Sequence, residues 1–186
     1  MKIRCFIALP LPSEIQRGIS QVQEKLRASE ATVRWEPSEK FHITMKFLGD
    51  KEESQLSSLT SSLSASVQEI QSFALSFRHV GGFPTDEKPR IVWIGTDIPP
   101  VFATLHRHIE EVCSTYGVEK DDRAFHPHVT MGRVKGGHNI HRLTEILKSI
   151  TFEPLQFRCT EIRIMRSELF PTGSYYTLMS AIPLQP

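Results

Sequence analysis

The chain has 186 residues, of which 39% are hydrophobic and 23% charged, and its formal net charge is +1. This composition excludes a disordered chain, and the mixing of basic with acidic residues excludes a protein that coats long nucleic acid with a basic stripe. Three cysteines without a C-x-x-C pair predict free thiols in a reducing compartment.

The N-terminal third of the chain predicts five elements in the order strand, helix, short strand, strand and helix. The opening apolar run, residues 3–9, predicts a buried strand and is too short for a signal peptide or a membrane span. We therefore expect a cytoplasmic protein without a membrane partner. Apolar residues at helical spacing predict amphipathic helices that begin near Ser13 and Ser54, and a short strand is expected over residues 32–35.

The third strand of this region, residues 41–48, shows the clearest alternation in the chain. Alternation predicts two faces: one with Phe41, Ile43, Met45 and Phe47, and the other with His42, Thr44 and Lys46. We expect Gly49 and Asp50 to end the strand.

The rest of the chain continues with short strands and two helices. We expect strands over residues 73–80, 91–95, 128–134, 160–169 and 174–182, and helices over 101–116 and 140–150. The segment Gly81–Pro84 predicts a turn, and Phe170–Gly173 predicts the turn of a hairpin. The pattern favours one domain over residues 1–186, of the α+β class, with largely antiparallel sheets.

A four-residue pattern occurs twice. His42-Ile43-Thr44-Met45 and His128-Val129-Thr130-Met131 share the form His, β-branched apolar, Thr, Met, and the two histidines lie 86 residues apart (128 − 42). On a strand each His projects beside its Thr, while the residue between them points to the opposite face. The repeat predicts two similar lobes that bring both imidazoles and both hydroxyls to one cleft.

Two imidazoles suit the hydrolysis of a phosphodiester. Because the ordinary pKa of histidine is near 6.5, one ring can be neutral and accept a proton while the other is charged and donates one. Threonine hydroxyls can donate to the non-bridging phosphoryl oxygens. Arg133 fits a phosphate, but an ideal strand would place it on the face opposite His128, so it reaches the cleft only if the strand ends or bulges near Gly132.

Two other interpretations of the histidines stay open at this point. His126 and His128 form an H-x-H pair that could bind a metal with Asp121 or Asp122. We favour a site without metal or cofactor. The cleft could also bind an RNA end or a nucleotide without catalysis, or it could act on another substrate, such as a linear 2'-5' phosphodiester or an ADP-ribose cyclic phosphate.

The doubled pattern resembles the two HxTx signatures of the 2H phosphoesterase superfamily. Further blocks resemble one branch of it, the RNA 2',3'-cyclic phosphodiesterases, also called 2'-5' RNA ligases. These blocks are RCFIALP from Arg4, HITMKFLGD from His42, PRIVWIG from Pro89, and the tail that contains Ser167-Glu168-Leu169, Pro171, Gly173 and Tyr176. They extend over nearly the whole chain.

This resemblance implies two pseudo-symmetric lobes of mainly antiparallel sheet, with outer helices, around a central cleft. It implies metal-independent hydrolysis of an RNA or nucleoside 2',3'-cyclic phosphate to a 2'-phosphomonoester, which is reversible as 2'-5' ligation. His42 would donate a proton to the leaving 3'-oxygen and His128 would activate water. Thr44, Thr130 and Arg133 would bind the phosphoryl group. We expect a monomer whose partner is an RNA 3' end or a nucleotide that carries the cyclic phosphate.

The chain also contains aromatic residues that could stack on a base. The candidates are Phe6, Trp35, Phe41 and Phe125. Each of them could instead pack in the hydrophobic core.

Overall fold

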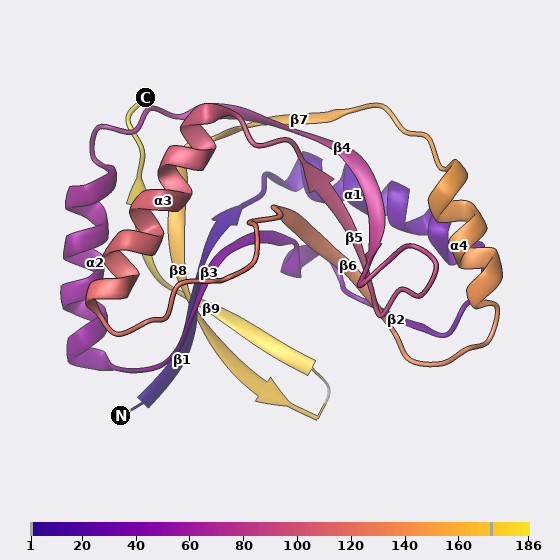
Figure 1. Cartoon of the computed structure of the whole chain (residues 1–186), viewed down its shortest axis with the longest axis horizontal. Coiled ribbons are helices and arrows are strands. Elements are labelled where there is room, and N and C mark those ends of the chain that lie inside the picture. Colours follow the sequence, from indigo (N-terminus) through magenta and orange to yellow (C-terminus); the bar gives the residue numbers. More distant parts are fainter. Residues whose placement is uncertain (1, 172) are drawn as a thin grey trace.

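Two antiparallel sheets form the frame of the molecule (Figure 1). The computed structural model describes residues 2–171 and 173–186. The four-stranded sheet has the order β3-β1-β8-β9, and its strands are β1 (Lys2–Pro10), β3 (His42–Glu52), β8 (Glu161–Phe170) and β9 (Gly173–Pro183). The five-stranded sheet has the order β2-β6-β5-β4-β7, and its strands are β2 (Val33–Trp35), β4 (Phe73–Phe83), β5 (Ile91–Thr96), β6 (His128–Val134) and β7 (Leu155–Cys159).

The helices lie on the outer sides of the two sheets (Figure 1). Helices α2 (Glu53–Val67) and α3 (Pro100–Thr115) contact each other and β3, so they cover the four-stranded sheet. Helices α1 (Ser13–Arg27) and α4 (Ile140–Ser149) contact each other, β7 and β4, so they cover the five-stranded sheet. No helix in the described part of the chain is long and apolar enough to cross a membrane.

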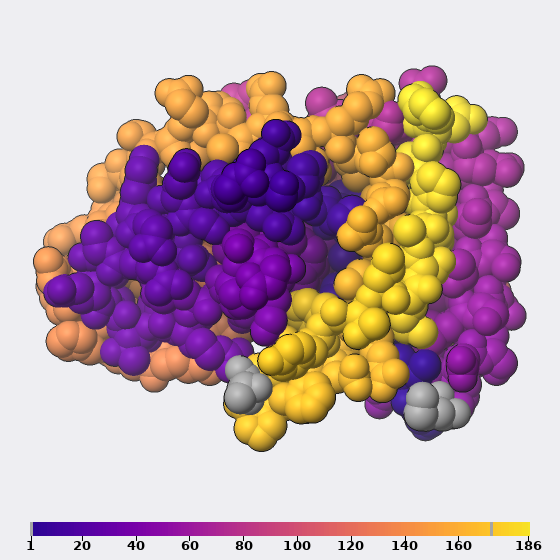
Figure 2. Space-filling view, turned by 180° about the vertical axis from the view of Figure 1, so that it is seen from behind, coloured from indigo at the N-terminus to yellow at the C-terminus, as the bar shows by residue number. Residues whose placement is uncertain are grey.

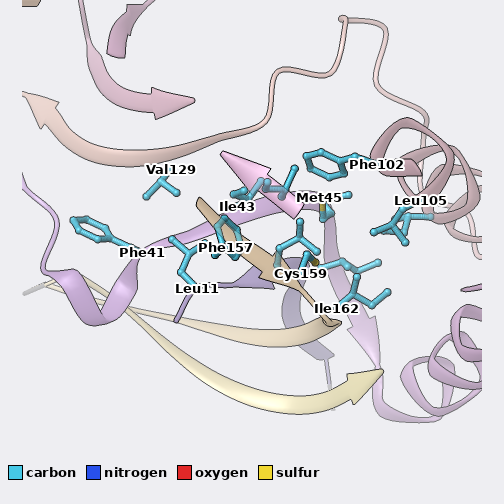
Figure 3. Close-up of a cluster of buried hydrophobic side chains, with 14 of the residues drawn as sticks. Leu11, Phe41, Ile43, Met45, Phe102, Leu105, Val129, Phe157, Cys159 and Ile162 are labelled. Carbon is cyan, nitrogen blue, oxygen red and sulfur yellow. The ribbon is translucent and has the colours of Figure 1, made fainter. Parts of the chain in front are cut away.

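Each sheet with its two helices forms one lobe, and the predicted α+β class with two mainly antiparallel lobes is confirmed. The four-stranded lobe and the five-stranded lobe are not halves of the sequence, because the chain crosses between them several times. One continuous hydrophobic cluster includes side chains of both sheets (Figure 3). We therefore propose that residues 1–186 form a single domain, since neither lobe has a core of its own.

The alternation predicted for the strand after Phe41 is wrong beyond Met45. In the pairing of β1 with β3, Ala8 lies opposite Thr44 and Ile7 lies opposite Lys46, so Met45 has no partner. This bulge reverses the inside and outside positions that follow it. Lys46 is therefore only 3% exposed, whereas Phe47 is 69% exposed.

The buried Lys46 is held by two acidic residues. Its Nζ lies 2.8 Å from Oε1 of Glu110, on α3, and 3.1 Å from Oδ2 of Asp121, in the loop before β6. Burial alone would lower the pKa of Lys46, but the hydrogen bonds to the two carboxylates outweigh it and raise that pKa. The ion pairs join β3 to α3 and to the loop that leads to His128.

Several strand boundaries differ from the sequence prediction. Strand β3 continues through Gly49 and Asp50 to Glu52, and β7 was not predicted at all. Strand β4 continues through Gly81 to Phe83. A Cβ at position 81 would lie 2.5 Å from Cζ2 of Trp93, on the neighbouring strand β5, so only glycine fits there. The glycine thus reflects a close approach between neighbouring strands rather than a turn.

The predicted C-terminal hairpin is confirmed for the described residues. Phe170 is paired with Gly173 in the register of β8 with β9, and Thr172 of the predicted turn lies outside the described residues. Figure 2 shows β9 in yellow as a band beside the indigo and purple residues of the N-terminal region.

The three cysteines are free, as predicted, and all three are buried. Burial raises the pKa of Cys5 to about 11, and the pKa values of Cys113 and Cys159 to about 12. The thiols therefore stay protonated at neutral pH.

Candidate active site

The two histidines of the repeated pattern are held in the same way. Nδ1 of His42 lies 2.7 Å from the carbonyl oxygen of Lys40, and Nδ1 of His128 lies 2.6 Å from that of His126. A carbonyl can only accept, so in both rings Nδ1 carries a proton and donates it. The neutral form of each ring therefore has its lone pair on Nε2, which is left available to a substrate.

The structure brings all five predicted site residues to one cleft between the sheets. The cleft has a volume of about 350 Å³ and is lined by His42, Thr44, His128, Thr130 and Arg133. His42 and Thr44 come from the four-stranded sheet and the other three from the five-stranded sheet. The roles assigned to these side chains stay predictions.

The residues between each His and Thr point away from the cleft, as the strand period predicts. Ile43 is fully buried and Val129 is 1% exposed. Figure 3 shows both side chains in the hydrophobic cluster, which also contains Met45 of β3 and Phe157 of β7. The core thus fixes the height and direction of both histidine-bearing strands.

Arg133 reaches the cleft because β6 has a bulge at the same position of the pattern as β3. Trp93 lies opposite Thr130 and Val92 lies opposite Gly132, so Met131 has no partner. The extra residue turns Arg133 to the same side as His128 and Thr130. The condition stated for Arg133 from the sequence is met by this bulge.

The bulges in β3 and β6 lie at the same position of the repeated pattern, but the residues that they turn into the cleft are chemically different. Phe47 follows the bulge in β3 by two residues, and Arg133 follows the bulge in β6 by two residues; both line the cleft. The repeat therefore supplies two imidazoles and two hydroxyls, but only the five-stranded side supplies a guanidinium at this place. At this place the five-stranded side presents a cation and the four-stranded side an aromatic ring.

The electrostatic surroundings of the two histidines differ. Burial lowers the pKa of both rings, and the hydrogen bonds to the carbonyls partly offset this effect. The carboxylate of Glu36 favours the charged form of His42, whereas His126 and Arg133 disfavour the charged form of His128. The pKa of both rings is thus lowered, but a carboxylate faces His42, beside the weaker opposing effect of His128, whereas only basic groups face His128.

Sequence reasoning missed several residues of the cleft. Arg4, Glu36, Lys40 and Tyr176 all line it, and they come from four different segments of the chain. Arg4 and Tyr176 belong to blocks that resemble the family, but no local pattern places any of the four in the cleft, because their approach depends on which strands pair. The exposure of Phe47 was also missed, since it follows from the bulge at Met45.

Of the four aromatic residues considered for base stacking, only Phe6 lines the cleft. Its ring lies 5.0 Å from that of His42 and 5.1 Å from that of Tyr176, between ring centroids. Phe41 belongs to the hydrophobic core. Phe125 stacks on His106, and the guanidinium of Arg27 lies over the ring of Trp35.

Two of the residues considered for a metal site have other contacts. Asp121 binds Lys46, and the ring of His126 lies 4.5 Å from that of Trp93, between centroids. In residues 2–171 and 173–186, no three His, Cys, Asp or Glu side chains form a group that could hold a metal ion.

Comparison with known proteins places the chain in a family. Residues 11–169 match the model of the 2'-5' RNA ligase superfamily. The chain belongs to this superfamily. The resemblance inferred from the doubled pattern is thereby confirmed, and with it the expectation of an enzyme of this kind.

Curated members of the superfamily match over almost the full length of the chain. An RNA 2',3'-cyclic phosphodiesterase of Methanothermobacter thermautotrophicus is 32% identical over 185 residues, which cover 99% of this chain and 100% of the relative. The protein with the same name from Thermotoga maritima is 28% identical over 177 residues, which cover 95% of this chain and 93% of the relative.

Solved structures of superfamily members share the fold. Escherichia coli LigT complexed with 3'-AMP has a TM-score of 0.79, 23% identity, and full coverage of both chains. TT0787 of Thermus thermophilus has a TM-score of 0.81 and 23% identity, with 98% of each chain covered. At this identity the likeness establishes the fold and not the substrate.

Proposed function

We propose that this protein hydrolyses RNA or nucleoside 2',3'-cyclic phosphates to 2'-phosphomonoesters, without a metal ion. The observation that carries the proposal is the geometry of the cleft: two imidazoles from facing sheets, each with a free Nε2 and each beside a threonine. The names of the two curated relatives support the choice of substrate. The nucleotides 3'-AMP and ATP in structures of Escherichia coli LigT agree with a nucleotide partner.

The two histidines divide the proton transfers of the reaction. A water molecule attacks phosphorus and gives a proton to Nε2 of His128, while the bond from phosphorus to the 3'-oxygen breaks. Nε2 of His42 donates its proton to that oxygen, which leaves as a 3'-hydroxyl. The environments favour this assignment, since Glu36 stabilises a charged His42 and Arg133 stabilises a neutral His128.

The remaining groups stabilise negative charge on the phosphoryl oxygens. The hydroxyls of Thr44 and Thr130 donate to the two non-bridging oxygens, and the guanidinium of Arg133 binds one of them. Together these side chains supply the charge stabilisation for which many phosphoesterases use a metal. The same steps give 2'-5' ligation when an RNA 5'-hydroxyl takes the place of water: it attacks phosphorus, gives its proton to His128, and the 3'-oxygen leaves with the proton of His42.

The proposal is tested by turnover of a 2',3'-cyclic nucleotide in the presence of EDTA. We expect full activity with chelator, and a loss of roughly 10²–10⁴-fold in kcat for either His42→Ala or His128→Ala, with little change in thermal stability. Binding without turnover would identify a binding module instead, and loss of turnover in EDTA would refute the metal-free mechanism. Analysis of the products by ³¹P NMR separates a 2'-phosphomonoester from the product of a linear 2'-5' phosphodiesterase.

Two further expectations stay predictions from the sequence: the cytoplasmic location and the monomeric state.

A further inference from the structure

A carboxylate lies inside the cleft that is proposed to bind a phosphate. Glu36 lines the cleft, its side chain is 19% exposed, and its Oε1 lies 3.5 Å from Nε of Arg133. Oε1 also lies 3.9 Å from Nη2 of Arg34, which is more exposed. A negative group beside the arginine that binds an anion is unexpected, because it opposes that binding.

The backbone holds Glu36 in this position. Its N–H donates to the carbonyl oxygen of Met131, the bulged residue of β6, at 2.8 Å. Its own carbonyl accepts a hydrogen bond of 2.8 Å from Nε2 of Gln23, a side chain that is 4% exposed. The backbone of Glu36 is therefore bonded to the same bulge that turns Arg133 into the cleft, so the carboxylate does not lie on a free surface loop.

The proposed reaction changes the charge of the bound phosphate. A 2',3'-cyclic phosphodiester carries one negative charge. Addition of water gives a phosphomonoester, which loses a further proton above about pH 6 and then carries two negative charges. A fixed negative group near the phosphate repels the second form more strongly than the first, and the difference is largest where water is partly excluded.

We propose that Glu36 is a specificity-determining residue, which lets the cleft accept the singly charged diester and expel the doubly charged monoester. This inference rests on the proposed function. Glu36 competes with the phosphate for Arg133. The singly charged diester is repelled less by Glu36 and needs only one neutralising partner, so this competition weakens its binding less than that of the doubly charged monoester. Glu36 also favours the charged form of His42. The same carboxylate thus stabilises the proton donor and promotes the release of the product.

The test compares two ligands that differ by one charge. The probes are adenosine 2'-phosphate, a dianion at pH 8, and its methyl phosphodiester, a monoanion; calorimetry gives Kd for each with the wild type and with Glu36→Gln. We expect Glu36→Gln to lower Kd for adenosine 2'-phosphate about tenfold more than Kd for the methyl ester, which corresponds to about 1.4 kcal/mol. Glu36→Asp, which keeps the charge, should retain the discrimination of the wild type.

Glu39→Gln is the matched control. Glu39 lies three residues further along, is exposed and does not line the cleft, so neutralising it should leave the ratio of the two Kd values unchanged. If Glu36→Gln does not fold, Glu36→Asn removes the same charge. An unchanged ratio in the neutral variant would overturn the proposal.

Equal weakening of both ligands would also overturn it, because it would show that Glu36 only positions Arg133. The binding ratio is measured without turnover. A wild type that binds both ligands but does not hydrolyse the cyclic phosphate would refute the proposed function and not this inference.

Discussion

Replacing Lys46 by methionine is expected to lower the free energy of unfolding by about 3 kcal/mol. The side chain of Lys46 is 2% exposed, and its Nζ contacts Glu110 at 2.8 Å and Asp121 at 3.1 Å. Methionine has nearly the same length, so the hydrophobic part of the side chain still packs. The variant loses the charge and the hydrogen bonds from Nζ to the two carboxylates.

The size of the expected loss in stability follows from the surroundings of the two carboxylates once the ammonium group is removed. The side chain of Asp121 is 65% exposed and returns to water at little cost. The side chain of Glu110 is 12% exposed and, among the residues that the structure describes, keeps only Nε2 of His106 within 4 Å, at 3.8 Å. Removing one partner of a buried ion pair costs about 3–5 kcal/mol, and the exposure of Asp121 favours the lower end. For a chain of this size the melting temperature should fall by about 6–12 °C.

The pH dependence has a definite sign. The pKa of Lys46 is raised in the folded state, so its contribution to stability is complete below the unfolded-state pKa and is lost only as the pH rises through the folded-state value. The difference between wild type and variant should therefore be constant across neutral pH. On the alkaline side it should shrink only at a strongly alkaline pH.

Urea unfolding of three variants measures the effect: Lys46→Met, Glu110→Gln and the double variant. The double variant should be more stable than Lys46→Met, because glutamine at position 110 leaves no buried charge without a partner. A loss below about 1 kcal/mol for Lys46→Met, or simple additivity of the two substitutions, would refute this reasoning.

Two further predictions concern the cleft. With rising pH, kcat/KM for a 2',3'-cyclic nucleotide should increase as His128 loses its proton and decrease as His42 loses its own. Because burial lowers the pKa of both histidines, the maximum should lie below pH 6.5. An optimum in alkaline solution would contradict the assignment. Arg133→Lys should reduce kcat/KM by about 10–100-fold without loss of stability, since an ammonium cannot replace the planar fork of the guanidinium; steady-state kinetics and thermal unfolding measure both quantities.

The sequence predicts the site better than it predicts the topology. The histidines and threonines could be placed because the period of a strand is a local property, and both copies of the pattern obey it up to the threonine. Beyond this point each strand has a bulge, which depends on the pairing partner and leaves no mark in its own residues. Arg133 could therefore only be placed conditionally, and Phe47 was placed on the wrong face.

The arrangement of the lobes depends on long-range pairing. Strand β1 pairs with β3 and β8, and the C-terminal hairpin joins the N-terminal strand in one sheet. Strand β7, missed from the sequence, is a short edge strand that pairs only with β4 in the described part of the chain. Glu36 was missed for a similar reason, since its approach to Arg133 follows from the pairing of β2 with β6.

The burial of all three cysteines has a practical consequence for spectroscopy. Their thiols are protonated at neutral pH and shielded from solvent, so maleimide dyes and nitroxide labels should react with them slowly. A single cysteine introduced on the exposed surface, for example in place of Glu39, would then be the preferred attachment point. The native sequence can thus carry one reporter group without prior removal of its own thiols.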